Sequence, residues 1–423
     1  RPDARHGQRH VRAALNGMVE RRQIATVDHV LQCNAFAFLF RIDDRFGHTP
    51  NPHMHHRRSL LALAAAVAAF PLSVRSQAAE QQPVRVAGGW RMHGRDYQVG
   101  TLQVHWDDAR IEIESAVTVP SRPHAVVPEA HGGFMAVATR PGTWLLRVDA
   151  QGRVAQQVTM ADEGDARTLD GHVVASRDGQ WLYSGETDRR SGEGWVSVRD
   201  ARTLRKVAQF RTGGIDPHQI LVADDDMLLV ANGGIPRTPT GGKRDLDQMD
   251  PALVRLNPGN GEVLGEWKLP DRRLSPHHIA WNHPTQPDQR RLLGIGLQAE
   301  HDHAAQRREA PLLAVWDGQR LRIPRQPVVE GYAGDVAAGP DGGFVLTAQF
   351  ANRIVMWRPG HPDELTPIGQ VQNPCGLWPL DGAQGVIAGG GLGLARWHAR
   401  DPARMLRWPA GLSADNHWAV LAA

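Results

Sequence analysis

Seven short segments recur along the chain at a roughly regular interval, and each opens with a polar residue followed by small and apolar ones. Successive polar residues are 48, 46, 59, 58, 40 and 42 positions apart. Repeats of this length are typical of propellers and solenoids, in which each unit buries its apolar surface against its neighbours. We refer to these positions as the seven marked residues: His124, His172, His218, His277, Asp335, Cys375 and His417.

Between two marked residues, short β-type runs alternate with turns. After His172 the chain reads HVVAS, WLYSGE, WVSVRDA and RTLRKVAQF within residues 172–210. Asp-Gly and Asn-Gly pairs, which favour tight hairpin turns, occur between such runs at 178–179, 260–261, 341–342 and 381–382. Four short antiparallel strands per unit of about 45 residues predict one propeller blade per repeat.

The two ends of the chain fix the expected number of blades. The last repeat begins at His417 and has room for only one strand before the chain stops at Ala423. Three β-type runs, 84–92, 97–106 and 110–119, precede the first marked residue and have no other partner. We therefore predict an all-β, seven-bladed propeller over residues 84–423, whose last blade joins the N-terminal strands to the C-terminal one and leaves no open sheet edge.

The first 78 residues are predicted to lie outside the propeller. Arg57 and Arg58 precede an apolar run, residues 59–72, that is too short for a comfortable membrane span and ends near a small-x-small cleavage pattern. Residues 54–78 thus fit a twin-arginine signal peptide, which predicts a periplasmic protein. Residues 1–53 show no consistent periodicity, and we interpret them as an upstream start-site error or a disordered segment.

Charge, cysteine content and motifs exclude several classes of protein. The formal charge is only +3 and is concentrated before residue 60, so the chain carries no nucleic-acid footprint. Cys33 and Cys375 are the only cysteines, and Cys33 precedes the mature chain, so we expect no internal disulfide. No G-x-S-x-G, P-loop, H-E-x-x-H or C-x-x-C-H motif occurs, which removes support for the corresponding hydrolases, nucleotide-binding proteins, zincins and c-type cytochromes.

The marked residues predict a circle of side chains at the propeller axis, because the first strand of each blade lines the central channel. Imidazole and thiolate are ligands for Cu, Fe or Zn rather than for Ca or Mg. The same positions also suit a structural role, in which histidines hydrogen-bond to backbone and trapped water. Both interpretations stay open for the axial candidates, which include His278 beside His277.

Two long insertions, 235–251 and 299–311, and the ends of the second strands predict a further set of polar residues around the channel mouth. Carboxylates and histidines in such a set could hold a metal or act as acid and base; solvated loop polarity is the alternative, and it is favoured because the EHDH run (300–303) has no second anchored ligand in the sequence. The candidates are Glu186, Asp188, Asn232, Gln298, Glu300, His301 and His303.

Several segments together resemble a family of exported bacterial proteins, the domain of unknown function DUF1513. The segments are ANGGI (231–235), MDPALVRL (249–256), GLQAE (296–300), PCGL (374–377) and DNHWAV (415–420). The resemblance covers about residues 84–421 and implies a seven-bladed, WD40-like or YVTN-like propeller, a twin-arginine signal and a link to periplasmic iron-uptake proteins of the imelysin type. The sequence departs from the family pattern at PRTPTGG (236–242). In the fourth unit, the family's histidine corresponds better to His278 than to His277.

These observations lead to two functional hypotheses. The first is a periplasmic accessory propeller that binds a metal, a small ligand or a partner of an iron-uptake system through its histidine-rich axis. The second is a metal-dependent enzyme, either a lactonase-type hydrolase or a redox enzyme. A purely structural scaffold is the third reading, because the propeller fold hosts all three kinds of protein.

Overall fold

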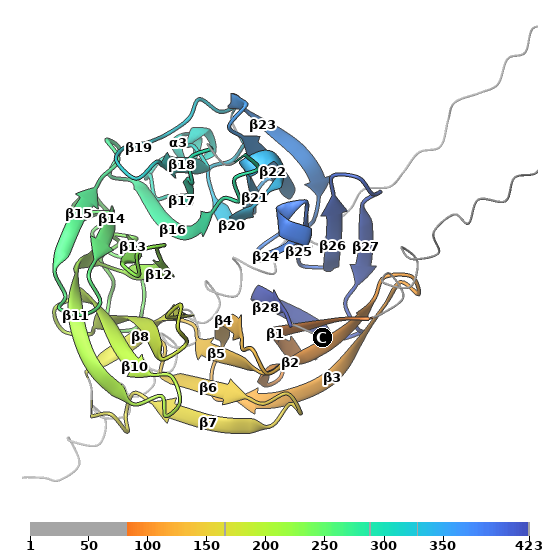
Figure 1. Cartoon of the computed structure of the whole chain (residues 1–423), viewed down its shortest axis with the longest axis horizontal. Coiled ribbons are helices and arrows are strands. Elements are labelled where there is room, and N and C mark those ends of the chain that lie inside the picture. The colour runs from red at the N-terminus through yellow and green to blue at the C-terminus, as the bar shows by residue number, and fades with distance from the viewer. Residues whose placement is uncertain (1–82, 165, 287–288, 328, 422–423) are drawn as a thin grey trace, which may run out of the picture. The chain divides into compact units, whose positions relative to one another are not determined.

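A computed structural model of the chain describes residues 83–164, 166–286, 289–327 and 329–421. Seven four-stranded antiparallel sheets surround a central axis, as Figure 1 shows. The predicted all-β, seven-bladed propeller is thus confirmed. The predicted signal peptide, residues 54–78 with Arg57 and Arg58, lies outside the described residues, as does segment 1–53.

The first four blades follow one another along the chain, and each is given from its innermost to its outermost strand. Blade 1 contains β4 (Pro123–Pro128), β5 (Phe134–Ala138), β6 (Trp144–Val148) and β7 (Val154–Thr159). Blade 2 contains β8 (Arg167–Ala175), β9 (Trp181–Asp188), β10 (Glu193–Asp200) and β11 (Lys206–Ile215). Blade 3 contains β12 (Pro217–Val222), β13 (Leu228–Asn232), β14 (Ala252–Leu256) and β15 (Val263–Trp267). Blade 4 contains β16 (Leu274–Trp281), β17 (Leu293–Ala299), β18 (Leu313–Trp316) and β19 (Leu321–Arg322).

The remaining blades complete the ring, and the short helices lie in the connections. Blade 5 contains β20 (Ala333–Ala338), β21 (Phe344–Ala348), β22 (Arg353–Arg358) and β23 (His361–Gln370). Blade 6 contains β24 (Leu377–Leu380), β25 (Gly385–Gly389), β26 (Gly393–His398) and β27 (Arg404–Arg407). Blade 7 contains β28 (Leu412–Val420), β1 (Val84–Met92), β2 (Tyr97–His105) and β3 (Arg110–Val119). The helical turns are η1 (Leu246–Gln248), α3 (Ala304–Glu309), η2 (Pro340–Gly342) and η3 (Asp381–Ala383).

Blade 7 closes the ring by joining the two ends of the propeller. The C-terminal strand β28 is its innermost strand and pairs antiparallel with β1, with Trp418 opposite Gly88. The Arg122 guanidinium then contacts the Asp415 carboxylate at 2.9 Å, which ties blade 1 to β28 across 293 residues of sequence. This is the closure that the unpaired runs at both ends of the sequence predicted.

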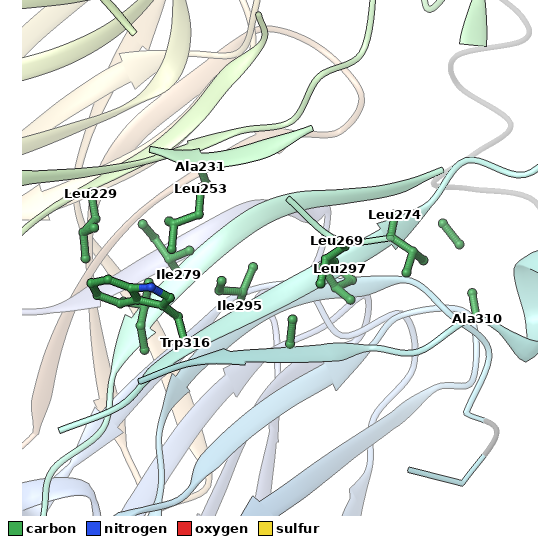
Figure 2. Close-up of a cluster of buried hydrophobic side chains, with 13 residues drawn as sticks. Leu229, Ala231, Leu253, Leu269, Leu274, Ile279, Ile295, Leu297, Ala310 and Trp316 are labelled. Carbon is green, nitrogen blue, oxygen red and sulfur yellow. The ribbon is translucent and has the colours of Figure 1, made fainter. Parts of the chain in front are cut away.

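Hairpin turns and interblade packing position the strands. Gly179 and Gly261, both in the predicted hairpin positions, have φ values of +69° and +77°, a region that glycine enters without steric cost. Apolar side chains of neighbouring blades interlock between the sheets. In Figure 2, Leu229 and Leu253 of blade 3 pack with Ile279, Ile295 and Trp316 of blade 4.

The inner strands all begin at the same face of the propeller, which we call the mouth face. Because the second strand of each blade runs antiparallel to the first, the connection that follows it returns to this face. The two long insertions, 235–251 after β13 and 299–311 after β17, are such connections. Among the described residues, no helix has both the length and the apolar character needed to cross a membrane.

Candidate metal centre

Irregular pairing at the start of the inner strands surrounds the marked residues. The register of strand pairing shifts between Pro123 and Val126, between Leu169 and Val173, and between Pro217 and Gln219, around three marked histidines. A β-bulge of this kind re-aims a side chain. The sequence favours it where proline precedes histidine, as at His124, His218 and His277, because proline cannot donate a hydrogen bond to the ladder.

Four buried imidazoles meet at the axis and form what we call the histidine cluster: His124, His172, His278 and His417. Each offers one ligand nitrogen, and these four nitrogens all lie within 4.8 Å of one another. They come from blades 1, 2, 4 and 7. The rings pack mostly edge to face, with centroids of His124 and His417 4.8 Å apart and those of His278 and His417 4.7 Å apart.

The cluster contains nitrogens that no described residue satisfies. Both ring nitrogens of His124, Nε2 of His172, Nδ1 of His278 and Nε2 of His417 are buried without a hydrogen-bond partner in the described part of the chain. A buried polar atom left unpaired costs about 1–3 kcal/mol. Trapped water or a bound metal ion would satisfy these nitrogens.

Neighbouring residues orient the cluster from outside. Asp335 Oδ2 lies 3.3 Å from Nδ1 of His417 and also accepts the backbone N–H of Leu377 at 2.9 Å. His218 Nε2 lies 3.0 Å from His278 Nε2, so one of these two nitrogens carries the proton that they share. Carboxylates and imidazoles in this outer position fix the tautomer of a metal-binding histidine. Asp335 thus contacts one candidate ligand, His417, whereas the ring of His218 packs against three cluster rings, those of His124, His172 and His278.

Burial favours the neutral form of three cluster histidines, His124, His172 and His278, and of the neighbouring His218. Desolvation lowers the pKa of His124, His172, His218 and His278 well below the ordinary value, and the positive charge of Arg140 lowers each pKa further. Neutral imidazole is the form that donates a lone pair to a metal. His124, His172 and His278 therefore present neutral rings to a cation, while the positive charge of Arg140 opposes a cation as it opposes imidazolium.

His277 does not belong to the cluster, although it adjoins His278 and is only 1% exposed. Ser275 Oγ donates to the carbonyl oxygen of Gly233 at 2.7 Å, so it accepts from His277 Nδ1 at 3.0 Å. Nε2 then accepts a hydrogen bond from Arg140 at 3.0 Å. Both ring nitrogens are engaged, so His278 is the histidine of blade 4 that is available for metal.

Cys375 also stays apart from the four imidazoles. Its half-buried Sγ accepts a hydrogen bond from Gln349 Nε2 at 3.2 Å and lies 3.6 Å from the carbonyl oxygen of Asn373. Among the described residues, the group of possible metal ligands contains histidine alone. Of the seven marked residues, His124, His172 and His417 thus join the cluster, and His278 takes the place of His277.

The predicted mouth residues do not converge on one point. Glu186 is fully buried between Arg199 and Lys206, at 2.9 Å from each, inside blade 2. Asp188 caps its own turn by accepting the backbone N–H groups of Arg190 and Ser191.

The remaining mouth candidates are engaged separately. Asn232 donates to the carbonyl oxygen of Thr212, Gln298 forms a backbone bridge with Tyr332, and Glu300 pairs with Lys243. His301 lies 2.9 Å from Asp271, and His303 occupies the N-cap position of α3 without a side-chain capping hydrogen bond. The side chains of Asn232, Glu300 and His301 therefore each have a separate local partner.

A cavity of about 230 Å³ on the mouth face was not predicted, and we call it the arginine pocket. It is lined by strand ends and connections of blades 1, 2 and 3, including Arg140, Asp170, Asp216, Arg237 and Arg244. Asp216 Oδ1 accepts from Arg140 at 2.9 Å and from Arg237 at 2.7 Å. Burial tends to raise the pKa of Asp216, but the two arginines outweigh it and hold that pKa well below its usual range.

Asp170 is the second buried carboxyl of the pocket. Burial, followed by the negative charge of Asp216, raises its pKa to about 7. The Thr187 hydroxyl donates to Asp170 Oδ2 at 2.7 Å. These residues come from three separate repeats, so no spacing in the sequence marks them; the only local signal is the aspartate that precedes Pro217 and His218.

Comparisons with solved structures place the fold among known propellers. A streptogramin B lyase aligns with a TM-score of 0.51 at 12% identity, covering 70% of this chain and 86% of its own. A proposed 6-phosphogluconolactonase from Bacteroides fragilis aligns at 0.53 and 11% identity, covering 81% and 98%. Hydrazine synthase from Kuenenia stuttgartiensis aligns at 0.51 and 12% identity, covering 75% and 94%. At such identities the likeness shows the fold alone.

Sequence comparison identifies the family. None of the curated proteins matches this chain. The family described as protein of unknown function (DUF1513) matches residues 117–421, which include all seven marked residues. Since this match spans well over half of the sequence, the chain belongs to the DUF1513 family.

Proposed function

We propose that this protein is a metal-binding propeller that holds one transition-metal ion at its axis through His124, His172, His278 and His417. The observation that carries the proposal is the meeting of four buried ligand nitrogens within 4.8 Å of one another. Nitrogens bound to one ion at about 2.0–2.1 Å lie at most about 4.2 Å apart. Small rotations of the rings would therefore bring all four into coordination.

The four imidazole donors limit which metal ions the site would prefer. Imidazole suits Zn, Cu and Fe, and affinity among divalent ions is greatest for Cu²⁺. Four neutral ligands leave the positive charge of the ion uncompensated in the first shell, and Asp335 behind His417 provides a nearby negative charge. We expect Cu²⁺ to bind most tightly, followed by Zn²⁺ and then Fe²⁺.

The number of ligands favours binding over catalysis. Structural zinc sites use four protein ligands, whereas catalytic sites keep one position open for water or substrate. The four histidines are each no more than 8% exposed. The metal-dependent enzyme remains the alternative and requires one of the four histidines to leave the ion during turnover.

The twin-arginine motif at Arg57 and Arg58 supports export to the periplasm as part of the same proposal. There the protein would act as an accessory component of metal acquisition, possessing a site that captures a metal ion and a mouth face that a partner could contact. The family resemblance is what suggests iron uptake as the process. The test below therefore begins with protein from the periplasmic fraction.

The experiment is elemental analysis of the full chain isolated from the periplasm, followed by titration of the metal-free protein with Cu²⁺, Zn²⁺ and Fe²⁺. We expect one ion per chain and a higher melting temperature with metal. His278→Ala should abolish binding, and Asp335→Asn should weaken it by about 10–100-fold through the lost partner of His417.

Adjacent histidines supply the matched control. His277→Ala removes an equally buried imidazole whose nitrogens are both engaged by Ser275 and Arg140, so it should retain metal. A wild-type protein that neither contains nor takes up any of the three metals would refute the proposal. Equal loss of metal in the His277 and His278 variants, with both still folded by circular dichroism, would refute the assigned ligands.

A further inference from the structure

The arginine pocket holds more positive charge than its own acids neutralise. Five arginines and three aspartates line it, the arginines being Arg140, Arg189, Arg190, Arg237 and Arg244. Arg189, Arg190 and Arg244 lie at the exposed edge, where Arg244 also pairs with Asp245. The largely buried Arg140 and Arg237 face the buried Asp170 and Asp216, so stabilisation of an anion depends on the donors that these two guanidiniums keep free at the cavity wall.

The two inner guanidiniums are fixed in place yet not saturated. Arg140 donates to Asp216 and to His277, and Arg237 donates to Asp216 through two nitrogens and to the carbonyl oxygen of Gly241 through the third. A guanidinium has five N–H donors. Counting bonds to the described residues, Arg140 has three donors left and Arg237 has two, at the wall of the cavity.

The pocket is a built feature of the fold, since its outer wall packs onto a neighbouring blade. Gly241, in the insertion after β13, has a φ of +90°, and a Cβ there would lie 2.7 Å from Cδ of Pro141 in blade 1. Ile215, Ile235 and Pro236 add apolar surface to the same cavity. Convergent cations beside an apolar wall are typical of a site for a small organic anion.

We propose that the arginine pocket binds a small dianionic organic molecule, with its anionic oxygens on Arg140 and Arg237 and its carbon skeleton against the isoleucines. Arginine pairs bidentately with carboxylate and phosphate. A cavity of about 150 Å³ accommodates benzene, so the 230 Å³ here fits a ligand of about a dozen heavy atoms or fewer. The ligand class is therefore a dicarboxylate or a phosphate monoester of that size.

This inference does not depend on the histidine cluster, and the test keeps the two sites separate. Metal-free full chain is titrated calorimetrically with succinate, with phenyl phosphate and with neutral succinamide. We expect succinate or phenyl phosphate to bind and succinamide not to bind. Preference between the two anions identifies carboxylate or phosphate as the recognised group.

Charge variants locate the bound anion. Arg237→Gln should weaken binding at least tenfold, and Arg244→Gln, at the exposed edge of the pocket, should weaken it several-fold without disturbing the buried pairs. Arg153→Gln removes an equal charge from a side chain that is 74% exposed in blade 1, and it should bind as the wild type does.

Three results would overturn the proposal. One is the absence of binding by either anion at millimolar concentration; another is binding of succinamide as tightly as of succinate. The third is unchanged affinity in both pocket variants. If Arg237→Gln fails to fold, the Arg244 variant decides alone, and none of these outcomes affects metal binding.

Discussion

At the scale of single residues, glycines decide whether the imidazoles can approach one another. Gly171 has a φ of +106°, and a Cβ there would lie 2.5 Å from Cδ2 of His124. The residue before His172 must therefore lack a side chain if blades 1 and 2 are to bring their histidines together. The Gly171-His172 pair is visible in the sequence, but the need for glycine there follows only from the position of His124 in the neighbouring blade.

Gly171→Ala should consequently weaken metal binding by about tenfold or more, because His124 must move from its place in the cluster. Gly179→Ala is the control for a side chain added at a positive φ, here +69°, since nothing lies within 4 Å of the added Cβ. Titration of both metal-free variants with Cu²⁺ measures the difference. Equal affinities would show that the His124 contact has no bearing on the centre.

The seven marked residues also show how far residue identity can be taken from sequence. The type of each one was informative, because a circle of imidazoles at an axis suggests a soft metal. The sequence did not show which way each side chain points, because His277 and His278 adjoin each other within a bulge. Ser275 on the same strand and Arg140 of blade 1 engage the first and leave the second for the cluster.

At the scale of elements, a buried ion network joins three strands of blade 2 to the segment before it. The Arg199 guanidinium on β10 is fully buried and contacts Glu186 on β9 at 2.9 Å and Glu163 at 2.5 Å. Lys206 on β11 lies 3.3 Å from Glu163. This network explains why Glu186, predicted at the channel mouth, serves the blade instead.

The network should make stability depend on pH through Glu163. Burial tends to raise the pKa of Glu163, but hydrogen bonds from Arg199 and the charges of Arg199 and Lys206 outweigh it and lower the pKa. Ionised Glu163 therefore stabilises the folded protein fully at pH values above the pKa of this residue in the unfolded chain, about 4.5. This stabilisation is lost as the pH falls through the lower pKa of the folded state. Glu163→Gln should cost about 1–2 kcal/mol at pH 7, and this difference should shrink below pH 4.

Urea unfolding at pH 7 and at pH 3 measures this effect. Glu193→Gln is the control, since Glu193 is 39% exposed and pairs with exposed Arg211, so it should change stability by less than about 1 kcal/mol. A Glu163 difference that grows as pH falls would contradict the assigned direction of the shift.

The strands and turns were the features of this protein that the sequence predicted best. The runs 84–92, 97–106 and 110–119 became β1, β2 and β3 with almost the same bounds. Alternation of apolar residues and Asp-Gly or Asn-Gly turns are local properties, so they act before any tertiary contact forms. The two insertions were recognisable as loops, but their contacts with other blades were not.

At the scale of the whole molecule, one tryptophan secures the closure of the ring. Trp418 on β28 stacks on Trp408 of blade 6, with ring centroids 4.7 Å apart, and on Trp90 of β1 at 6.3 Å. Added side-chain atoms at Gly88 or Gly389 would collide with its indole, so both strands approach it closely. The residue therefore joins blade 7 internally and to blade 6.

Trp418→Ala should lower the free energy of unfolding by about 3–5 kcal/mol, because it leaves a large cavity where the ring closes. Trp181→Ala removes the same side chain from a position that is 36% exposed and should cost much less. Urea denaturation followed by circular dichroism compares them. Similar losses in the two variants would mean that closure does not depend on Trp418.

The sequence by itself determined the number of blades, their strand order, the closing strand and the residue types at the axis. These follow from periodicity and turn chemistry, which are written along the chain at short range. Only the tertiary structure decided which four histidines share a centre, that Asp335 stands behind His417, and that Arg140, Asp216 and Arg237 form a pocket. Those outcomes depend on bulges and on contacts between loops of different blades. Such contacts join residues that have no regular spacing in the sequence.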